Sequence, residues 1–418
     1  MANTGSAQPD APETRARRFA ALGSWNFTAI WLGSIVSNAG VQVQEIAKAW
    51  LVLQLTDSAL ALGLIALCYA VPVILLPPVG GLLADRADRV TILKVTGAIM
   101  VVEPLALAAL LATGNAPLWV LYADTVLVAA VYAFNSPARQ ALVPALVPRE
   151  HLLSATSLMS VVWTGTALLG PALGGLLLPL LGAAWLFALN GLTTLAVLVP
   201  LFLLRGVRGR EADGATRAGR GVTAGLRFAW GHRPVLGLLG IVACVSLLDG
   251  GYQTLLPVFA RDVWHAGPDA FGLMRSIPGA GALLAGVGLA ALREVSGKGT
   301  LAVGALLVLC GALAGFALSP AYALGLVALF AIGLASSVCA TAVQTLLQLS
   351  VPGRVRGSVM ALNTVAWVGL NSLGGVLGGG LAEVLGARTA VAGSAAAVVL
   401  VTPVLARYVR GAGGGGMA

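Results

Sequence analysis

The sequence predicts an all-α integral membrane protein, with about twelve transmembrane helices in two six-helix bundles that repeat each other. Three observations predict this fold class: an apolar composition, a series of long apolar runs, and a repeat at a fixed offset. Of the 418 residues, 58% are hydrophobic and 10% are charged, whereas a soluble domain has roughly 45–50% and about 25%. Such a chain is too apolar to fold with a water-exposed surface.

Each apolar run is long enough to cross a bilayer, which takes roughly 20 apolar residues. The first six runs are 27–50, 58–84, 92–112, 117–136, 153–178 and 183–204. The other six are 234–259, 270–292, 300–318, 321–348, 357–382 and 388–408. An arginine-rich segment, 205–233, separates the two sets. We therefore predict bundles at 27–204 and 234–408, joined by this cytoplasmic linker.

The basic residues predict the orientation, because lysine and arginine are retained on the cytoplasmic side. With the N-terminus inside, nearly all of the 25 basic residues lie in or beside cytoplasmic segments. The exceptions are Lys48, Arg261, Arg275 and Arg388. We expect a multi-pass protein of a bacterial inner membrane, with cytoplasmic tails at 1–26 and at the glycine-rich 409–418. Retention and contact with anionic lipid explain the net charge of +9 without nucleic acid.

The two halves match at a constant spacing. Val147-Pro148 matches Val351-Pro352, and Gly174-Gly175 matches Gly378-Gly379, each 204 residues further on. The same spacing relates three further matches: Ser154 with Ser358, Leu158 with Leu362, and Gly182-Ala183 with Gly386-Ala387. Parallel six-helix repeats are a known transporter design that binds substrate near mid-membrane, between the halves.

Motifs for enzyme chemistry are missing from the sequence. Gly297-Lys298-Gly299-Thr300 lacks the hydroxyl directly after the lysine that a phosphate-binding loop requires. Cys68, Cys244, Cys310 and Cys339 show no Cys-x-x-Cys spacing, so we expect buried thiols without a disulfide or a zinc site. We therefore expect no enzyme activity, no cofactor and no metal, and we expect no cleaved signal peptide.

The loop after the second run carries the sequence Gly81-Leu-Leu-Ala-Asp85-Arg86-Ala-Asp88-Arg89. It resembles the signature that the major facilitator superfamily has between helices 2 and 3, although Asp88 and Val90 depart from that pattern. The Asp-Arg-x-Asp-Arg form resembles the branch of bacterial drug and siderophore exporters that includes the enterobactin exporter. The stretches 50–58, 134–140 and 351–363 support this resemblance, which covers nearly the whole chain.

Two motifs are expected to act in conformational change. One interpretation of the Asp85 loop is a conformational latch, formed by Gly81, Asp85, Arg86, Asp88 and Arg89. In this latch Asp85 would lie at the N-terminus of a neighbouring helix, because helix N-termini attract anions. A tight turn that anchors the inner side is the other reading. In the fifth run, Gly165, Gly170, Pro171, Gly174 and Gly175 resemble a motif associated with antiporters. The alternative is that these residues serve only close helix packing, because glycines are small and proline bends a helix.

Ionisable side chains inside a membrane are costly, so they are functional candidates by default. We select Glu45, Asp124 and Asp249 for proton coupling, because the resemblance implies that the first, fourth and seventh helices line the central cavity. A buried carboxyl group can take up a proton near neutral pH. The alternatives are a neutralising pair between Glu45 and Lys48 on one helix face, and structural hydrogen bonds for the two aspartates. Glu103 lies on the peripheral third helix and is expected to be structural.

Polar groups in these helices avoid lipid and therefore either line the pathway or bond other helices. The pathway candidates are Gln44, Tyr252, Gln253, Gln344, Asn363, Trp367 and Asn371.

The sequence favours a secondary transporter, acting as a monomer, that exports small amphipathic compounds such as drugs or siderophores in exchange for protons. The alternatives are a proton-coupled uptake symporter and a membrane sensor of the same fold that transports nothing.

Overall fold

The computed structural model describes residues 20–76, 88–114, 116–204, 221–291 and 297–410, and its regular elements there are all helical. The long helices of the first half are α2 Trp25–Thr56, α3 Ala59–Leu75, α5 Arg89–Ala112, α6 Leu118–Leu142, α7 Leu152–Leu181 and α8 Ala183–Leu203. Those of the second half are α10 Arg233–Val258, α11 Pro268–Ala291, α12 Lys298–Leu318, α13 Tyr322–Ser350, α14 Gly353–Leu385 and α15 Ala387–Arg410. Short helices occupy Ala20–Gly23, Val143–Ala145, Arg149–His151 and α9 Gly221–Gly231, and a π-helical turn, Phe259–Val263, extends α10.

Ten of the described helices are long and apolar enough to cross a membrane. They are α5 to α8 and α10 to α15. The described part of α3 is a shorter apolar helix, and α2 contains many polar residues. The prediction of an all-α membrane protein is confirmed, while twelve spans in two bundles stays a prediction. The predicted linker, 205–233, lies mostly in 205–220, outside the described residues. Its later part contains the short helix α9.

Local signals in the sequence explain several helix ends. The side chain of Ser58 accepts a hydrogen bond from the Ala61 N–H and begins α3. The side chain of Asp88 accepts one from the Thr91 N–H at 3.1 Å and begins α5. Gly182 and Gly386, which match in the sequence repeat, turn the chain after α7 and α14 with φ of 80° and 84°. Glycine adopts this conformation without steric cost, so the repeat includes the turns.

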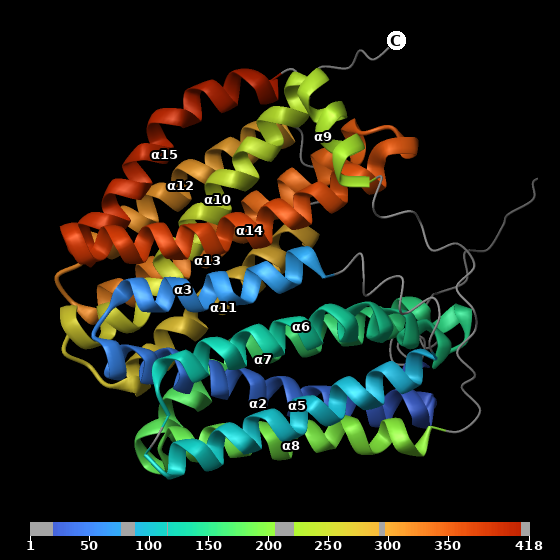
Figure 1. The fold of residues 1–418 in the computed structure, drawn as a ribbon. Helices are drawn as coiled ribbons and strands as arrows, with labels where there is room; N and C mark the ends of the chain where they lie inside the picture. The colour runs from blue at the N-terminus through green and yellow to red at the C-terminus, as the bar shows by residue number, and fades with distance from the viewer. Residues whose placement is uncertain (1–19, 77–87, 115, 205–220, 292–296, 411–418) are drawn as a thin grey trace, which may run out of the picture.

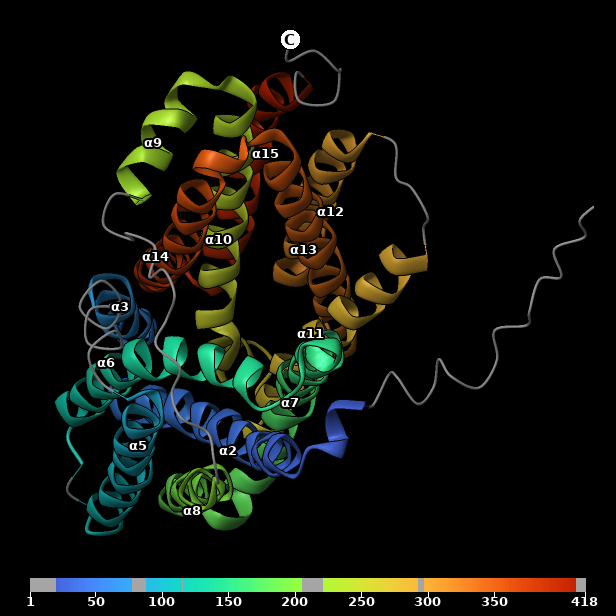
Figure 2. The ribbon, with the colours of Figure 1, turned by 90° about the vertical axis from the view of Figure 1, so that its right-hand side faces the viewer.

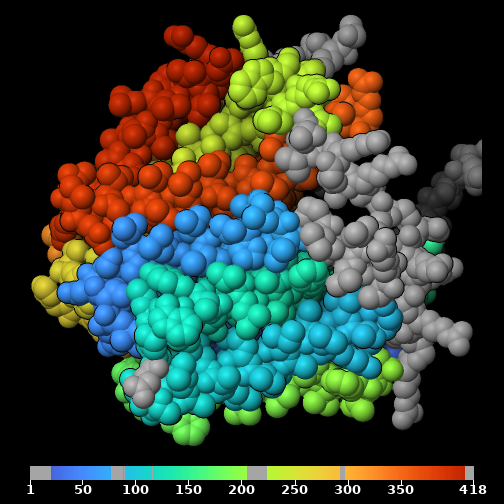
Figure 3. All heavy atoms as spheres, in the orientation of Figure 1, coloured from blue at the N-terminus to red at the C-terminus, as the bar shows by residue number. Residues whose placement is uncertain are grey.

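Helices pack mainly within each half of the chain (Figures 1 and 2). In the first half α2 packs on α7 and α8, and in the second half α10 packs on α14 and α15. Two extensive contacts join the halves: α3 with α14, and α7 with α11. Figure 3 shows α14 directly against α3, and α3 in turn against α6.

Helix α7 has one face of large apolar side chains and an opposite face of small residues. Leu169, Leu173, Leu176 and Leu180 lie three or four residues apart and are all exposed, as expected for a face that meets lipid. Gly170, Pro171, Gly174 and Gly175 occupy the opposite face and are buried. Large side chains thus face outward, and small ones face other helices.

The glycine pairs of the repeat make equivalent contacts in the two halves. A Cβ atom on Gly174 would lie 3.0 Å from the Val43 Cα of α2, and one on Gly378 would lie 2.8 Å from the Gly251 Cα of α10. A Cβ on Gly175 would lie 2.8 Å from the Gly272 Cα of α11, across the two halves. Its counterpart on Gly379 would collide with the Ala59 carbonyl of α3, also across the halves. The first glycine of each pair therefore packs within its half, and the second packs between the halves.

We predict that Gly175→Val forces α7 and α11 apart, because overpacking of a close contact costs about 1–3 kcal/mol and one or two kcal/mol changes an equilibrium by a factor of roughly 5–30. Spin labels at Leu181 and Leu318, which are both exposed, report the separation of the halves. Gly165→Val is the matched control on the same helix, since a Cβ there meets nothing within 4 Å. Identical distance distributions for the two variants would contradict the prediction.

Candidate functional site

A buried ion pair lies inside the first half. The Lys48 Nζ of α2 lies 3.0 Å from the Asp124 Oδ2 of α6, and each side chain is 4% exposed. Glu45, one turn before Lys48, places its Oε1 3.5 Å from the same ammonium group, with its own side chain 55% exposed. Lysine thus contacts one buried and one exposed carboxylate. The expected pair with Glu45 forms, but the shorter contact is to Asp124.

Glu103 of α5 joins this group from the neighbouring helix. Its carboxyl group lies within hydrogen-bonding reach of Asp124, and α5 packs on α6 along the bundle. We name Glu45, Lys48, Glu103 and Asp124 the Lys48 cluster. The sequence assigned Glu103 a structural role because its helix was expected at the periphery, and no local spacing links it to Asp124.

Asp249 of α10 is a separate buried carboxyl group in the second half. It is 5% exposed, and its Oδ2 accepts a hydrogen bond from Ser336 of α13 at 2.9 Å. Its Oδ1 is buried without a partner among the described residues. Arg275 of α11 lies near Asp249 and donates to Gln253. The three candidates for proton coupling therefore occupy two places, Glu45 with Asp124 and Asp249 on its own.

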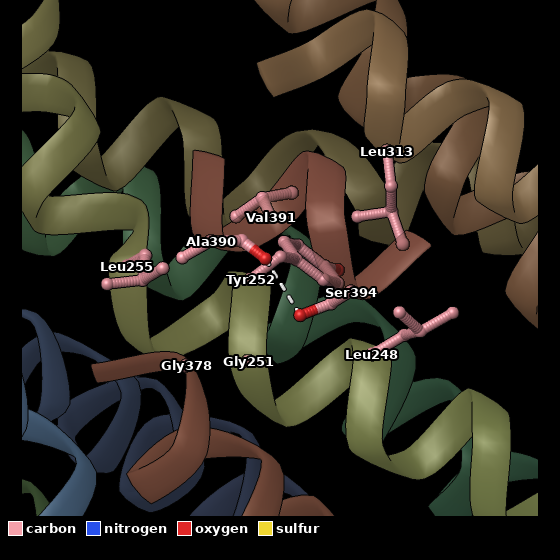
Figure 4. A pocket seen from close by; sticks show the side chains of 9 residues that line it. All are labelled: Leu248, Gly251, Tyr252, Leu255, Leu313, Gly378, Ala390, Val391 and Ser394. Carbon is pink, nitrogen blue, oxygen red and sulfur yellow. Dashed lines mark hydrogen bonds between the residues drawn. The ribbon is translucent and has the colours of Figure 1, made fainter. Parts of the chain in front are cut away.

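Several pathway candidates contact their own half. Asn190 of α8 donates to the Gln44 Oε1 at 2.5 Å, so Gln44 bonds two helices. Tyr252 is buried beside a small hollow between α10, α12, α14 and α15, which it lines with residues such as Leu248, Leu313 and Ser394 (Figure 4). All of its lining residues belong to the second half.

The other pathway candidates differ in exposure. Gln344 is exposed, whereas Asn363, Trp367 and Asn371 on α14 are half-buried. The Asn363 Oδ1 is buried without a partner among the described residues. Asn363 thus combines a buried, unpaired polar atom with a place on α14, a helix that also contacts the other half.

The motif of α7 lies at helix contacts for most of its length. A Cβ on Gly170 would lie 2.5 Å from the Gln42 Cβ of α2, whereas Gly165 has open space. In the latch loop, Gly81, Asp85 and Arg86 lie outside the described residues. Asp88 is exposed and caps α5, and Arg89 is the first residue of that helix.

Among the described residues, polar contacts between the halves gather at one end of the molecule, where α2 meets α3 and α14 meets α15. We name it the Asp57 end. Arg261, in the turn after α10, forms an ion pair with Asp57 and donates to the Leu53 carbonyl at 3.1 Å. Glu383 of α14 accepts hydrogen bonds from the Ser58 hydroxyl and from the Leu60 N–H.

Two further contacts between the halves lie slightly deeper from the same end. The rings of Trp50 on α2 and Phe271 on α11 stack with centroids 6.2 Å apart. The Ala172 N–H of α7 donates to the Ser276 hydroxyl of α11 at 2.9 Å. No local pattern in the sequence predicted this set of contacts, although Arg261 and Arg275 stand out as basic residues away from the cytoplasmic side.

Comparison with known proteins places the chain in a family. Residues 16–410 match the family model described as transmembrane secretion effector. An MFS-type transporter of Bacillus subtilis (strain 168), YfiS, is 32% identical over 363 residues, which cover 81% of this chain and 82% of that protein. The enterobactin exporter EntS of Shigella boydii serotype 18 is 25% identical over 371 residues, covering 89% and 88%.

Solved structures share the fold. A bacterial homologue of the human lysosomal transporter spinster, crystallised in an inward-facing and unoccupied conformation, superposes with a TM-score of 0.72 at 16% identity, over 96% of this chain and 99% of that one. A bacterial homologue of the iron transporter ferroportin, also inward-facing, gives 0.70 at 18% identity, over 92% and 98%. The predicted resemblance is confirmed. The chain belongs to the transmembrane secretion effector family and is a membrane transporter of the MFS type.

Proposed function

We propose that the chain exports a small amphipathic compound in exchange for protons, through alternating access between its two halves. The observation that carries the proposal is the buried ion pair of Lys48 and Asp124, with Glu45 exposed one turn away. Charges inside a membrane protein are expensive and mark ion or proton pathways. A carboxylate held by a buried lysine is a group whose charge state a proton can change.

The contacts at the Asp57 end support alternating access. With the N-terminus inside, as the basic residues predict, the Asp57 end faces outward. The halves then meet on the outer side, which corresponds to an inward-open conformation. Two of the solved structures with this fold are described as inward-facing. Opening to the outside requires the contacts of Arg261 and Glu383 to break.

Export is the direction favoured by the relatives and by the motif of α7. The enterobactin exporter is similar along most of the chain, and enterobactin-like siderophores define the class of compound to test first. Growth and accumulation assays with siderophores and toxic compounds, in strains with and without the chain, identify a substrate. In vesicles, substrate entry then raises the internal pH for an antiporter and lowers it for a symporter, while a sensor gives no flux.

We predict that Asp124→Asn abolishes substrate flux driven by a pH gradient in vesicles, because the amide cannot exchange a proton. This variant leaves Lys48 buried without its partner, and breaking a buried pair costs about 3–5 kcal/mol of stability. The double variant Lys48→Gln with Asp124→Asn removes both charges and is expected to recover thermal stability without recovering coupling. Glu150→Gln, an exposed carboxylate on the other side of the bundle, serves as the control. Full proton-driven flux in both Asp124→Asn and Glu45→Gln would contradict the assignment.

We predict that Arg261→Gln shifts the protein toward the outward-open conformation by less than about fivefold, because exposed ion pairs contribute about 0.2–1 kcal/mol. Asp57 is 81% exposed in this pair. A cysteine introduced at Phe271, between the halves, is expected to react faster with an impermeant maleimide from outside. Arg388→Gln removes the same charge from the same predicted side and is expected to leave the rate unchanged. Equal rates of maleimide reaction in the two variants would show that Arg261 does not hold the halves together on the outer side.

We predict that Asp85→Asn leaves the protein inserted and folded but slows transport, because an amide binds a helix N-terminus more weakly than a carboxylate does. Initial flux at saturating substrate is the measurement. Glu150→Gln is again a suitable control for charge. Unchanged flux for Asp85→Asn would favour the reading as a turn that only anchors the inner side.

A further inference from the structure

Two carboxyl groups of the Lys48 cluster, those of Glu103 on α5 and Asp124 on α6, lie close together where these helices pack. Glu103 and Asp124 lie within hydrogen-bonding reach, yet the Glu103 Oε1 and both Asp124 carboxylate oxygens are buried without a hydrogen-bond partner among the described residues. The Asp124 Oδ2 has Lys48 at 3.0 Å, which leaves the Glu103 Oε1 and the Asp124 Oδ1 without a donor. Ionised carboxylates only accept hydrogen bonds, whereas a protonated carboxyl group also donates. One added proton therefore satisfies both orphaned oxygen atoms at once.

The charges of the cluster require the same proton. Within the part of the chain that the structure describes, Lys48 is the one cation beside Glu45, Asp124 and Glu103. Glu45 is half-exposed, so its charge is partly screened by its surroundings. The buried remainder is one ammonium and two carboxyl groups, which is neutral only when the two carboxyl groups share one proton. Two carboxylates in contact in a low-dielectric site do not both ionise.

Among the described residues, the helices packed around the cluster place no other counter-charge beside it. Helix α8, which packs on α5, has no ionisable side chain along Ala183–Leu203. A further titratable group close to the cluster is the phenol of Tyr69, whose ring lies 6.4 Å from that of Tyr132. Neutral phenols do not balance a carboxylate, so the shared proton is the remaining way to balance the buried charges.

We propose that the Glu103–Asp124 pair holds the exchanged proton, and that Glu103 is a proton-binding residue of the transporter. This inference rests on the proposed proton exchange and adds a residue from a helix outside the expected pathway. Proton uptake forms an O–H bond on one carboxyl group and a hydrogen bond to the other, and release reverses both. A proton held between two carboxyl groups in contact belongs to the pair and not to either residue alone.

The pair has a spectroscopic signature that needs no substrate. In infrared spectra of the purified chain in lipid nanodiscs, a protonated buried carboxyl group gives a carbonyl stretch that shifts in deuterium oxide. We expect this band in the wild type at neutral pH, and its loss in Glu103→Gln and in Asp124→Asn. Glu103→Asp is expected to restore it, which separates proton binding from a general folding defect. Asp249→Asn and Glu150→Gln identify bands that come from elsewhere.

The result that overturns the inference is a band with unchanged intensity and pH dependence in Glu103→Gln and Asp124→Asn. A band that Glu103→Asp fails to restore, although this variant folds as the wild type does, also overturns it. Vesicle flux of ethidium, an amphipathic cation, and of the substrate found by screening tests the proposed function separately. If the wild type shows flux driven by the pH gradient but the infrared band does not change in Glu103→Gln and Asp124→Asn, the inference about the pair is wrong and the proposed function stands. If the band is lost in these two variants but no pH-driven flux is found, the proposed function is wrong and the proton-binding pair stands.

Discussion

The close approach of helices from opposite halves is the constraint on which the rest of the structure depends. Gly175 meets Gly272 where α7 crosses α11, and Gly379 meets Ala59 where α14 crosses α3. Side chains at these crossings would hold the halves apart and would prevent Arg261 from reaching Asp57. In a membrane, close packing replaces the hydrophobic effect as the force between helices. The glycines therefore determine which polar contacts form between the halves.

This constraint also explains why the sequence repeat is informative. A constant offset of glycine pairs predicts that equivalent helices pack in equivalent ways, and Gly174 and Gly378 do contact the first helix of their own halves. Helix positions followed from apolar runs, because length and composition alone decide which segments cross a bilayer. Most of the predicted runs correspond closely to described helices, with α2 extending beyond its run at both ends. The second run, 58–84, continues past α3 into residues outside those described.

The charged site was less predictable, for a physical reason. Spacing along a helix reveals only local partners, so the sequence showed Glu45 beside Lys48 and left Asp124 as a separate candidate. The partner that lies closer to Lys48 comes from another helix, α6, and Glu103 comes from a third. Arg261 looked like an exception to the charge distribution, and its partner Asp57 lies in the other half. Contacts between distant segments need the packing of helices, which no local pattern contains.

Two kinds of polar burial in the first half serve different purposes. Gln44 and Asn190 form a neutral hydrogen bond between α2 and α8, which holds two helices together at little electrostatic cost. Lys48 and Asp124 bury opposite charges a few residues further along α2, and replacing such a pair by apolar residues often stabilises a protein. A fold that needed only cohesion between α2 and α6 would be better served by a neutral pair. The retained charges, together with the weak and exposed contacts of Arg261 at the Asp57 end, suit the proposed cycle, in which both the protonation and the open side change.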